Sequence, residues 1–95
     1  MKPRSRLELA SAFQRKGFRP REAEHTWYYL YIAGKRTPIR TKLSHGTQYR
    51  QYGPTLLGKV ADQLHLTAAE LADFVDCPLT YDSYIGLMRI RGQLR

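Results

Sequence analysis

The apolar and polar positions at the start of the chain follow the pattern of an amphipathic helix. Ser5 and Glu8 have the spacing of a capping box, and apolar residues then recur at intervals of three and four. Gly17 offers a C-terminal stop, because glycine adopts the left-handed conformation that ends many helices. These signals predict a helix over residues 6–16.

The next part of the chain has the composition and alternation of strands. Residues 18–21 form a short extended segment, and Pro20 within it favours the edge of a sheet. Residues 26–33 are rich in aromatic and β-branched types, which predicts a second strand. A hairpin turn at residues 34–35 then leads to a returning strand over residues 37–43. Alternation divides the second strand into Trp27, Tyr29 and Tyr31 on one face and Tyr28, Leu30 and Ile32 on the other.

A second helical part follows a polar loop. Residues 44–53 are polar and interrupted by glycines, which is typical of a loop, and Pro54 supplies the preset φ of a first helical turn. A capping-box spacing at residues 67–70 predicts a short helix to about residue 75, and a last helix begins at residue 80 or 81. The apolar positions are Leu56, Leu57, Val60, Ala61 and Leu64 in the first of these helices and Tyr84, Ile85, Leu87 and Met88 in the last.

The predicted order of elements is α-β-β-β-α followed by a small helical extension. This order predicts an α+β fold in which helices pack on one face of a three-stranded antiparallel sheet. The length suits one domain over residues 1–95, with a core of about residues 5–66 and an extension over 67–95. The other sheet face is left free, and aromatic and basic side chains on such a face are a means of holding RNA.

The charge of the chain is positive and unevenly distributed. Sixteen Lys and Arg residues against eight Asp and Glu give a formal net charge of +8. Residues 1–53 carry twelve basic and three acidic residues, and residues 54–95 carry four and five. Such asymmetry predicts a basic face for a polyanion and favours nucleic acid, although an anionic membrane or an acidic protein would use the same charge.

Several classes of protein do not fit the composition. The single cysteine, Cys77, forms no internal disulfide, and the histidines and the cysteine lack the spacings of a metal site. No apolar stretch approaches the roughly 18 residues of a membrane span, and the start of the chain lacks an export signal. We therefore expect a cytoplasmic protein with no membrane partner, no metal and no other cofactor, in which Cys77 is inert.

Motifs that occur in one particular order resemble the HicA toxin family. In that family a helix ending in Gly-Phe precedes a short strand, a "GSHH" segment, a hairpin, a loop that often contains His-Gly, and a helix introduced by a Gly-Thr-Leu-like turn. Here "LELASAFQRKGF" precedes a His-headed aromatic strand, a hairpin, a His-Gly loop and "YGPTLLGKVADQL". The matching positions, within about residues 5–66, are Gly17-Phe18, His25, His45-Gly46 and Gly53-Pro54-Thr55-Leu56-Leu57.

The resemblance implies an activity, a partner and a site. It implies a double-stranded-RNA-binding-domain-like fold in a toxin of a type II toxin-antitoxin system. Such a toxin is a metal-independent endoribonuclease that cleaves mRNA and is neutralised by a HicB-like antitoxin. The family's functional histidine heads the second strand and corresponds to His25. This chain departs from the "GSHH" pattern, because Ala23, Glu24 and Thr26 replace the Gly, the Ser and the second His.

The chemistry of RNA cleavage also favours His25 as the catalytic residue. In transesterification the 2′-hydroxyl attacks its own phosphodiester, while the enzyme moves protons and stabilises charge. An imidazole can act as base or acid near neutral pH. His45, in a loop, and Tyr28, on the same strand, are accessory candidates, and a solvated histidine and a core tyrosine are the alternatives. We expect His65, near a helix end, to be structural.

Basic residues recur along the returning strand. Arg36, Arg40 and Lys42 have the spacing of one strand face, and like charges there repel one another unless a polyanion or an acidic partner covers them. We interpret Trp27 and Tyr31 as packing residues. The RNA-binding candidates are Lys35, Arg36, Arg40 and Lys42, extended by Arg19, Arg21 and Arg50.

Two other functions remain compatible with the sequence. A catalytically inactive RNA-binding module of the same fold would show salt-sensitive binding without cleavage. A protein-interaction domain would use its basic face for an acidic partner. The sequence leaves the oligomeric state and the RNA sequence preference open.

Overall fold

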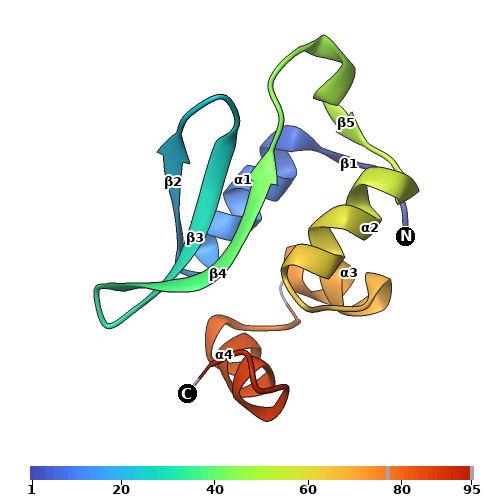
Figure 1. Cartoon of the computed structure of the whole chain (residues 1–95). Coiled ribbons are helices and arrows are strands. Elements are labelled where there is room, and N and C mark those ends of the chain that lie inside the picture. Colours follow the sequence, from blue (N-terminus) through green and yellow to red (C-terminus); the bar gives the residue numbers. More distant parts are fainter. Residues whose placement is uncertain (77, 95) are drawn as a thin grey trace.

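Three antiparallel strands form the central sheet of the computed structural model, which describes residues 1–76 and 78–94. The strands are β2 (Phe18–Glu22), β3 (Thr26–Ile32) and β4 (Lys35–Leu43), and β3 lies between the other two (Figure 1). Pro20 pairs with Tyr28 from the edge strand β2, where its missing N–H removes no bond from the interior of the sheet. The edge position predicted from Pro20 is confirmed.

Helices cover one face of this sheet. The helices are α1 (Arg6–Arg15), α2 (Pro54–Gln63), α3 (Ala68–Asp76) and α4 (Tyr81–Ile90). Thr26, Tyr28 and Leu30 of β3 are buried on the covered face, and the residues between them are half-buried. Among the described residues no helix crosses the other face, which is turned toward the viewer in Figure 1. The predicted α+β class and the α-β-β-β-α order are confirmed.

Both predicted capping boxes form. The Ser5 hydroxyl accepts a hydrogen bond from the Glu8 N–H (3.0 Å), and the Glu8 carboxylate accepts one from the Ser5 N–H (3.3 Å). Thr67 and Glu70 repeat the arrangement at α3, at 3.2 and 2.8 Å. Each box satisfies two backbone donors that the first turn of a helix leaves unpaired.

Two local predictions were wrong. The β3–β4 hairpin turns at Ala33 and Gly34 instead of residues 34–35, because these two residues have the positive φ angles, 50° and 77°, that a two-residue hairpin loop requires. Residues 44–53 are also more than a loop. They contain the 3₁₀ helix η1 (Thr47–Tyr49) and β5 (Gln51–Tyr52), which pairs antiparallel with β1 (Arg4–Ser5).

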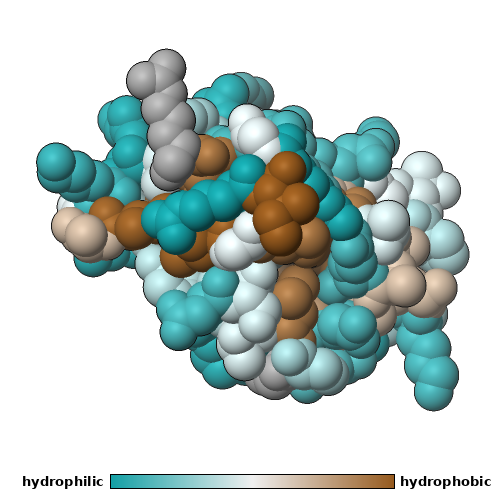
Figure 2. All heavy atoms as spheres, turned by 90° about the horizontal axis from the view of Figure 1, so that it is seen from below, coloured by the Kyte–Doolittle hydropathy of each residue, from teal (hydrophilic) through white to brown (hydrophobic). Residues whose placement is uncertain are grey.

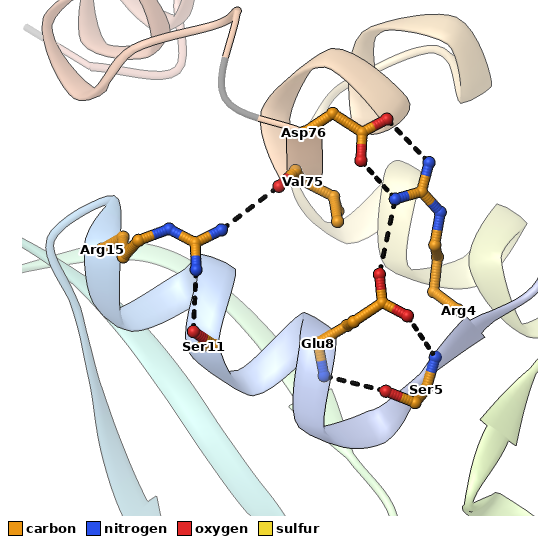
Figure 3. A network of polar contacts seen from close by, with 7 residues as sticks. All are labelled: Arg4, Ser5, Glu8, Ser11, Arg15, Val75 and Asp76. Atoms are coloured by element: carbon orange, nitrogen blue, oxygen red, sulfur yellow. Dashed lines mark hydrogen bonds and ion pairs between the residues drawn. The ribbon is translucent and has the colours of Figure 1, made fainter.

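Polar contacts join α3 to the beginning and the end of α1 (Figure 3). Arg4 donates two hydrogen bonds to the Asp76 carboxylate, and its guanidinium also lies 3.6 Å from Glu8. The hydrogen bonds from Arg4 lower the pKa of Asp76. Arg15 donates to the Ser11 hydroxyl at 2.7 Å and to the main-chain carbonyl of Val75 at 3.2 Å. These contacts fix α3 alongside α1.

An aromatic cluster packs α3 and α4 against the first helix and the sheet. Phe74 of α3 lies 5.2 Å from the ring of Tyr84, 5.9 Å from that of Phe18 and 6.2 Å from that of Phe13, between centroids. The Tyr84 hydroxyl donates a 2.8 Å hydrogen bond to the carbonyl of Leu64 at the end of α2. The four aromatic residues are buried in a single core cluster, so the helices beyond residue 66 close the core.

The surface on the side of α4 is mixed in character. Seen from below, apolar side chains reach the surface in patches between hydrophilic ones (Figure 2). Ile90, at the end of α4, is 84% exposed. No helix in the described ranges has the length and the apolar character needed to cross a membrane. The prediction made for Cys77 lies outside the described residues.

Candidate functional site

His25 lies at the tip of the β2–β3 hairpin. The loop that joins the two strands is closed by a hydrogen bond of 3.0 Å from the Ala23 N–H to the His25 carbonyl. The side chain of His25 is half-buried, whereas Glu24 beside it is exposed. No ion pair found in the described part of the chain includes Glu24. The charge of Glu24 therefore stays in solvent.

The imidazole of His25 lines a cleft of about 320 Å³ between the sheet and α2. Lys42 contributes a cation from β4 and Lys59 contributes one from α2. Tyr49 and Tyr52, from the segment between β4 and α2, line the same cleft. The site thus combines a titratable group with two cations, which can stabilise a phosphate, and with rings that can pack against a sugar or a base.

Partly buried polar contacts hold the walls of this cleft in place. The Gln63 side-chain oxygen, on α2, accepts hydrogen bonds from the Thr41 hydroxyl (2.6 Å) and from the Lys42 N–H (3.2 Å). The Tyr52 hydroxyl accepts one from the Ser44 N–H at 2.9 Å. The Gln63 bonds fix the end of β4 against α2, and the Tyr52 bond ties the residue after β4 to β5, so the fold sets the distance between the walls.

One nitrogen of His25 is unsatisfied. Its Nδ1 is buried and, among the described residues, has no hydrogen-bond partner. A buried polar atom without a partner costs about 1–3 kcal/mol, and such atoms in native proteins call for an explanation. No described side chain therefore orients the imidazole through Nδ1.

The uncovered side of the sheet, called the outer face below, carries a row of aromatic rings beneath cations. Arg40 lies over the ring of Trp27, with its guanidinium carbon 4.3 Å from the ring centroid. Arg36 lies over Tyr29 at 4.9 Å, and Arg40 also donates a 3.3 Å hydrogen bond to the Tyr29 hydroxyl, which lowers the pKa of that phenol. The outer face consists of Arg19, Arg21, Trp27, Tyr29, Tyr31, Arg36, Arg40 and Lys42.

The structure brings most of the predicted basic residues onto this face, but not all of them. Arg19 lies over the ring of Tyr31 at 4.3 Å, and Arg21 pairs with Trp27 across the β2–β3 ladder. Lys35 instead pairs with Ile32 at the hairpin end, and is therefore on the opposite strand face. Arg50 lies away from the sheet, where its carbonyl accepts a hydrogen bond from the N–H at the start of α1.

The sequence analysis interpreted Trp27 and Tyr31 as packing residues, but neither lies in the core. Both are half-buried on the outer face, where guanidinium groups cover them, while Tyr28 and Leu30 face the helices. Alternation separates the two sets of side chains correctly. Both sets are aromatic or apolar, however, so composition alone does not tell which of them faces the helices.

The accessory candidates are not neighbours of His25 in the cleft. His45 is exposed, and its Nε2 lies 3.7 Å from a Glu22 carboxylate oxygen and 3.4 Å from the Thr26 hydroxyl. Tyr28 is only 6% exposed and packs against Phe13, and burial raises the pKa of its phenol. Tyr28 is therefore a core residue, which is the alternative to an accessory role that the sequence left open.

Some residues of the cleft were not predicted as site residues. Lys59 and Tyr52 lie in the segment "YGPTLLGKVADQL", but neither they nor Tyr49 stood out as a catalytic or binding candidate. Packing of α2 against the end of β4 brings Lys59 to the cleft, and the segment between β4 and α2 supplies the two tyrosines. His65 follows α2 with a positive φ of 60°, and its N–H caps the helix by a bond to the Asp62 carbonyl, which agrees with the structural role expected for it. Within residues 1–76 and 78–94, no three His, Cys, Asp or Glu residues cluster as metal ligands would.

Comparisons of the chain with protein-family models, with curated proteins and with solved structures find no match.

Proposed function

We propose that this chain is a HicA-like toxin, a metal-independent endoribonuclease that cleaves mRNA with His25 as its proton-transfer group. The observation that carries the proposal is the position of His25, whose imidazole shares a cleft with Lys42 and Lys59 at the end of a cationic, aromatic sheet face. The order of motifs that resembles the family supports the same function. A cytoplasmic location, where mRNA is present, belongs to the proposal.

The residues of the cleft suffice for transesterification. The 2′-hydroxyl of one nucleotide attacks the adjacent phosphorus, and the bond from phosphorus to the 5′-oxygen breaks. The products are a 2′,3′-cyclic phosphate and a 5′-hydroxyl. His25 takes the proton from the 2′-hydroxyl or gives one to the leaving 5′-oxygen, and solvent completes the other transfer. Lys42 and Lys59 stabilise the negative charge that grows on the phosphoryl oxygens.

A HicB-like antitoxin is the protein partner of this proposal. The simplest way to neutralise the toxin is to cover the cleft or the outer face. The five cations of the outer face, Arg19, Arg21, Arg36, Arg40 and Lys42, enter none of the ion pairs found in the described part of the chain. They are therefore free to meet the carboxylates of an antitoxin as well as phosphates.

Growth and product chemistry test the proposal together. Expression of the wild-type chain should arrest growth, and expression of His25→Ala should not. His65→Ala is the matched control, because His65 caps α2 and is not among the residues that line the cleft. RNA incubated with the purified protein and EDTA should carry 2′,3′-cyclic phosphate ends. Growth arrest by His25→Ala, or products with 3′-hydroxyl ends, would refute the mechanism.

A binding-only module is the second candidate, and one observation favours it. The aromatic and cationic outer face is complete without His25, so RNA binding does not depend on cleavage. This candidate predicts RNA binding by the wild-type protein with intact RNA recovered at the end of the incubation.

A further inference from the structure

The aromatic rings of β3 form a row that ends at the cleft. Trp27, Tyr29 and Tyr31 occupy alternate positions of one strand, so they lie on the same face about 6.5–7 Å apart. His25 is the next alternate position, just before the strand begins. Lys42 links the two parts, because its ammonium lies 5.8 Å from the Trp27 ring centroid and its side chain also lines the His25 cleft.

The spacing of this row selects the kind of nucleic acid that fits it. Bases stacked in a duplex strand are about 3.4 Å apart, which is roughly half the distance between neighbouring rings of the row. Consecutive bases can therefore reach consecutive rings only after they separate from one another. A single strand can do this at low cost, whereas a duplex would have to lose its base pairs.

The cations above the rings complete a binding position for each nucleotide. One guanidinium lies over each ring, Arg40 over Trp27, Arg36 over Tyr29 and Arg19 over Tyr31, at 4.3, 4.9 and 4.3 Å. A guanidinium already stacked on a ring presents its second planar side to a base and its N–H groups to a phosphate. The positions repeat along the strand, as the nucleotides of an extended chain do.

We propose that the outer face binds three consecutive unpaired nucleotides of the RNA, one at each ring, and that the phosphodiester next to the Trp27 position is the one presented to His25. The binding part of this inference stands on the outer face alone. The cleavage part rests on the proposed function of His25.

Binding is measured with the His25→Ala protein, which leaves the RNA intact. Fluorescence anisotropy compares a labelled unstructured RNA of about ten nucleotides with the same strand in a duplex. We expect the single strand to bind at least tenfold more tightly. Tyr29→Leu should weaken this binding about 5- to 150-fold, because stacking contributes about 1–3 kcal/mol per base. Arg89→Gln, on the exposed side of α4, is the control and should leave the affinity unchanged.

Three results would overturn the inference. They are equal affinity for single strand and duplex, unchanged affinity in a folded Tyr29→Leu protein, and no RNA binding by a protein that instead binds an acidic polypeptide. Circular dichroism establishes that each variant is folded. If the wild-type protein binds single-stranded RNA in this way but cleaves nothing, the proposed function is wrong and the outer face remains the RNA-binding surface. Failure of the inference and failure of the proposed function are therefore distinguishable.

Substrates with an abasic nucleotide test whether the three bound nucleotides lie on one side of the scissile bond. In a substrate with one cleavage site, an abasic nucleotide at any of the three positions on one side of the scissile bond should raise KM about 5- to 150-fold. An abasic nucleotide four positions away should have no effect. Equal effects on both sides of the bond would contradict the assignment of the row to one side.

Discussion

The proposed binding of RNA to the outer face predicts a salt dependence of the affinity that can be calculated. Its five cations are Arg19, Arg21, Arg36, Arg40 and Lys42, and no carboxylate in the described ranges pairs with any of them. Each phosphate that a cation neutralises releases counterions, which gives a slope of about −0.7 per contact in a plot of log affinity against log salt for single strands. Five contacts predict a slope of about −3.5, and a loss of affinity of about 100-fold between 50 and 200 mM salt.

One substitution should change this slope by a known amount. Arg40→Gln removes one contact, so the slope should become less steep by about 0.7, and the affinity should fall as well. Tyr29→Leu removes stacking and no charge, so it should lower the affinity and leave the slope as it was. Arg89→Gln carries the same change of charge on α4 and serves as the control.

The assay is fluorescence anisotropy of a labelled single-stranded RNA with the His25→Ala protein, from 50 to 300 mM KCl. A slope between about −2.5 and −4.5 agrees with the outer face as the binding surface. A slope near zero, or a slope that Arg40→Gln and Arg89→Gln change equally, would refute the reasoning, because the charge that matters would then not lie on this face.

Three further predictions concern the stability of the fold. Phe74→Ala should lower the free energy of unfolding by about 3–5 kcal/mol in urea denaturation, because the ring is fully buried between α1, β2 and α4. Glu70→Gln should lower the free energy of unfolding at neutral pH, because the hydrogen bond from Arg91 stabilises the Glu70 carboxylate and lowers its pKa to about 2. The difference in this free energy between wild type and variant should vanish as the pH falls from about 4.5 to 2. Gly17→Ala should cost more than Gly34→Ala in thermal unfolding, because both glycines have positive φ, but only at Gly17 would a Cβ atom come within 2.4 Å of a tyrosine ring.

Each of these predictions has an outcome that contradicts it. Asp73→Ala, an exposed position on the same helix, is the control for Phe74→Ala, and equal effects of the two would mean that α3 is not part of the core. A Glu70→Gln difference that stays constant with pH would show that the carboxylate is not stabilised in the folded state. Equal costs at Gly17 and Gly34 would mean that α4 does not pack against the start of β2.

Much of the fold is predictable because it depends on short-range patterns. The capping boxes at Ser5 and Thr67, the edge strand with Pro20 and the alternation along β3 are properties of a few consecutive residues. The pairing of β1 with β5 has no such local signal, because it joins Arg4 to Tyr52. A two-stranded pair of two residues each is too short to leave a pattern in the sequence.

In the candidate site, too, the residues with a local sequence pattern were predictable and those placed by long-range packing were not. His25 and the spacing of the strand cations were visible in the sequence, since one is a motif position and the others alternate. Lys59 was not, because its contribution depends on how α2 packs against the end of β4 through Gln63. The exposure of Trp27 was not visible either, because a half-buried tryptophan under a guanidinium has the same sequence signature as one in a core.

The measurement that tests the central claim most directly is the single-turnover rate of RNA cleavage in EDTA. The substrate is an unstructured RNA, and the proteins compared are wild type, His25→Ala and the control His65→Ala. We expect cleavage by wild type and by the control, and a rate about 10²- to 10⁴-fold lower for His25→Ala. A 2′-deoxy nucleotide at the scissile position should abolish the cut. Equal rates for wild type and His25→Ala, or cleavage of the deoxy substrate, would contradict the assignment of His25.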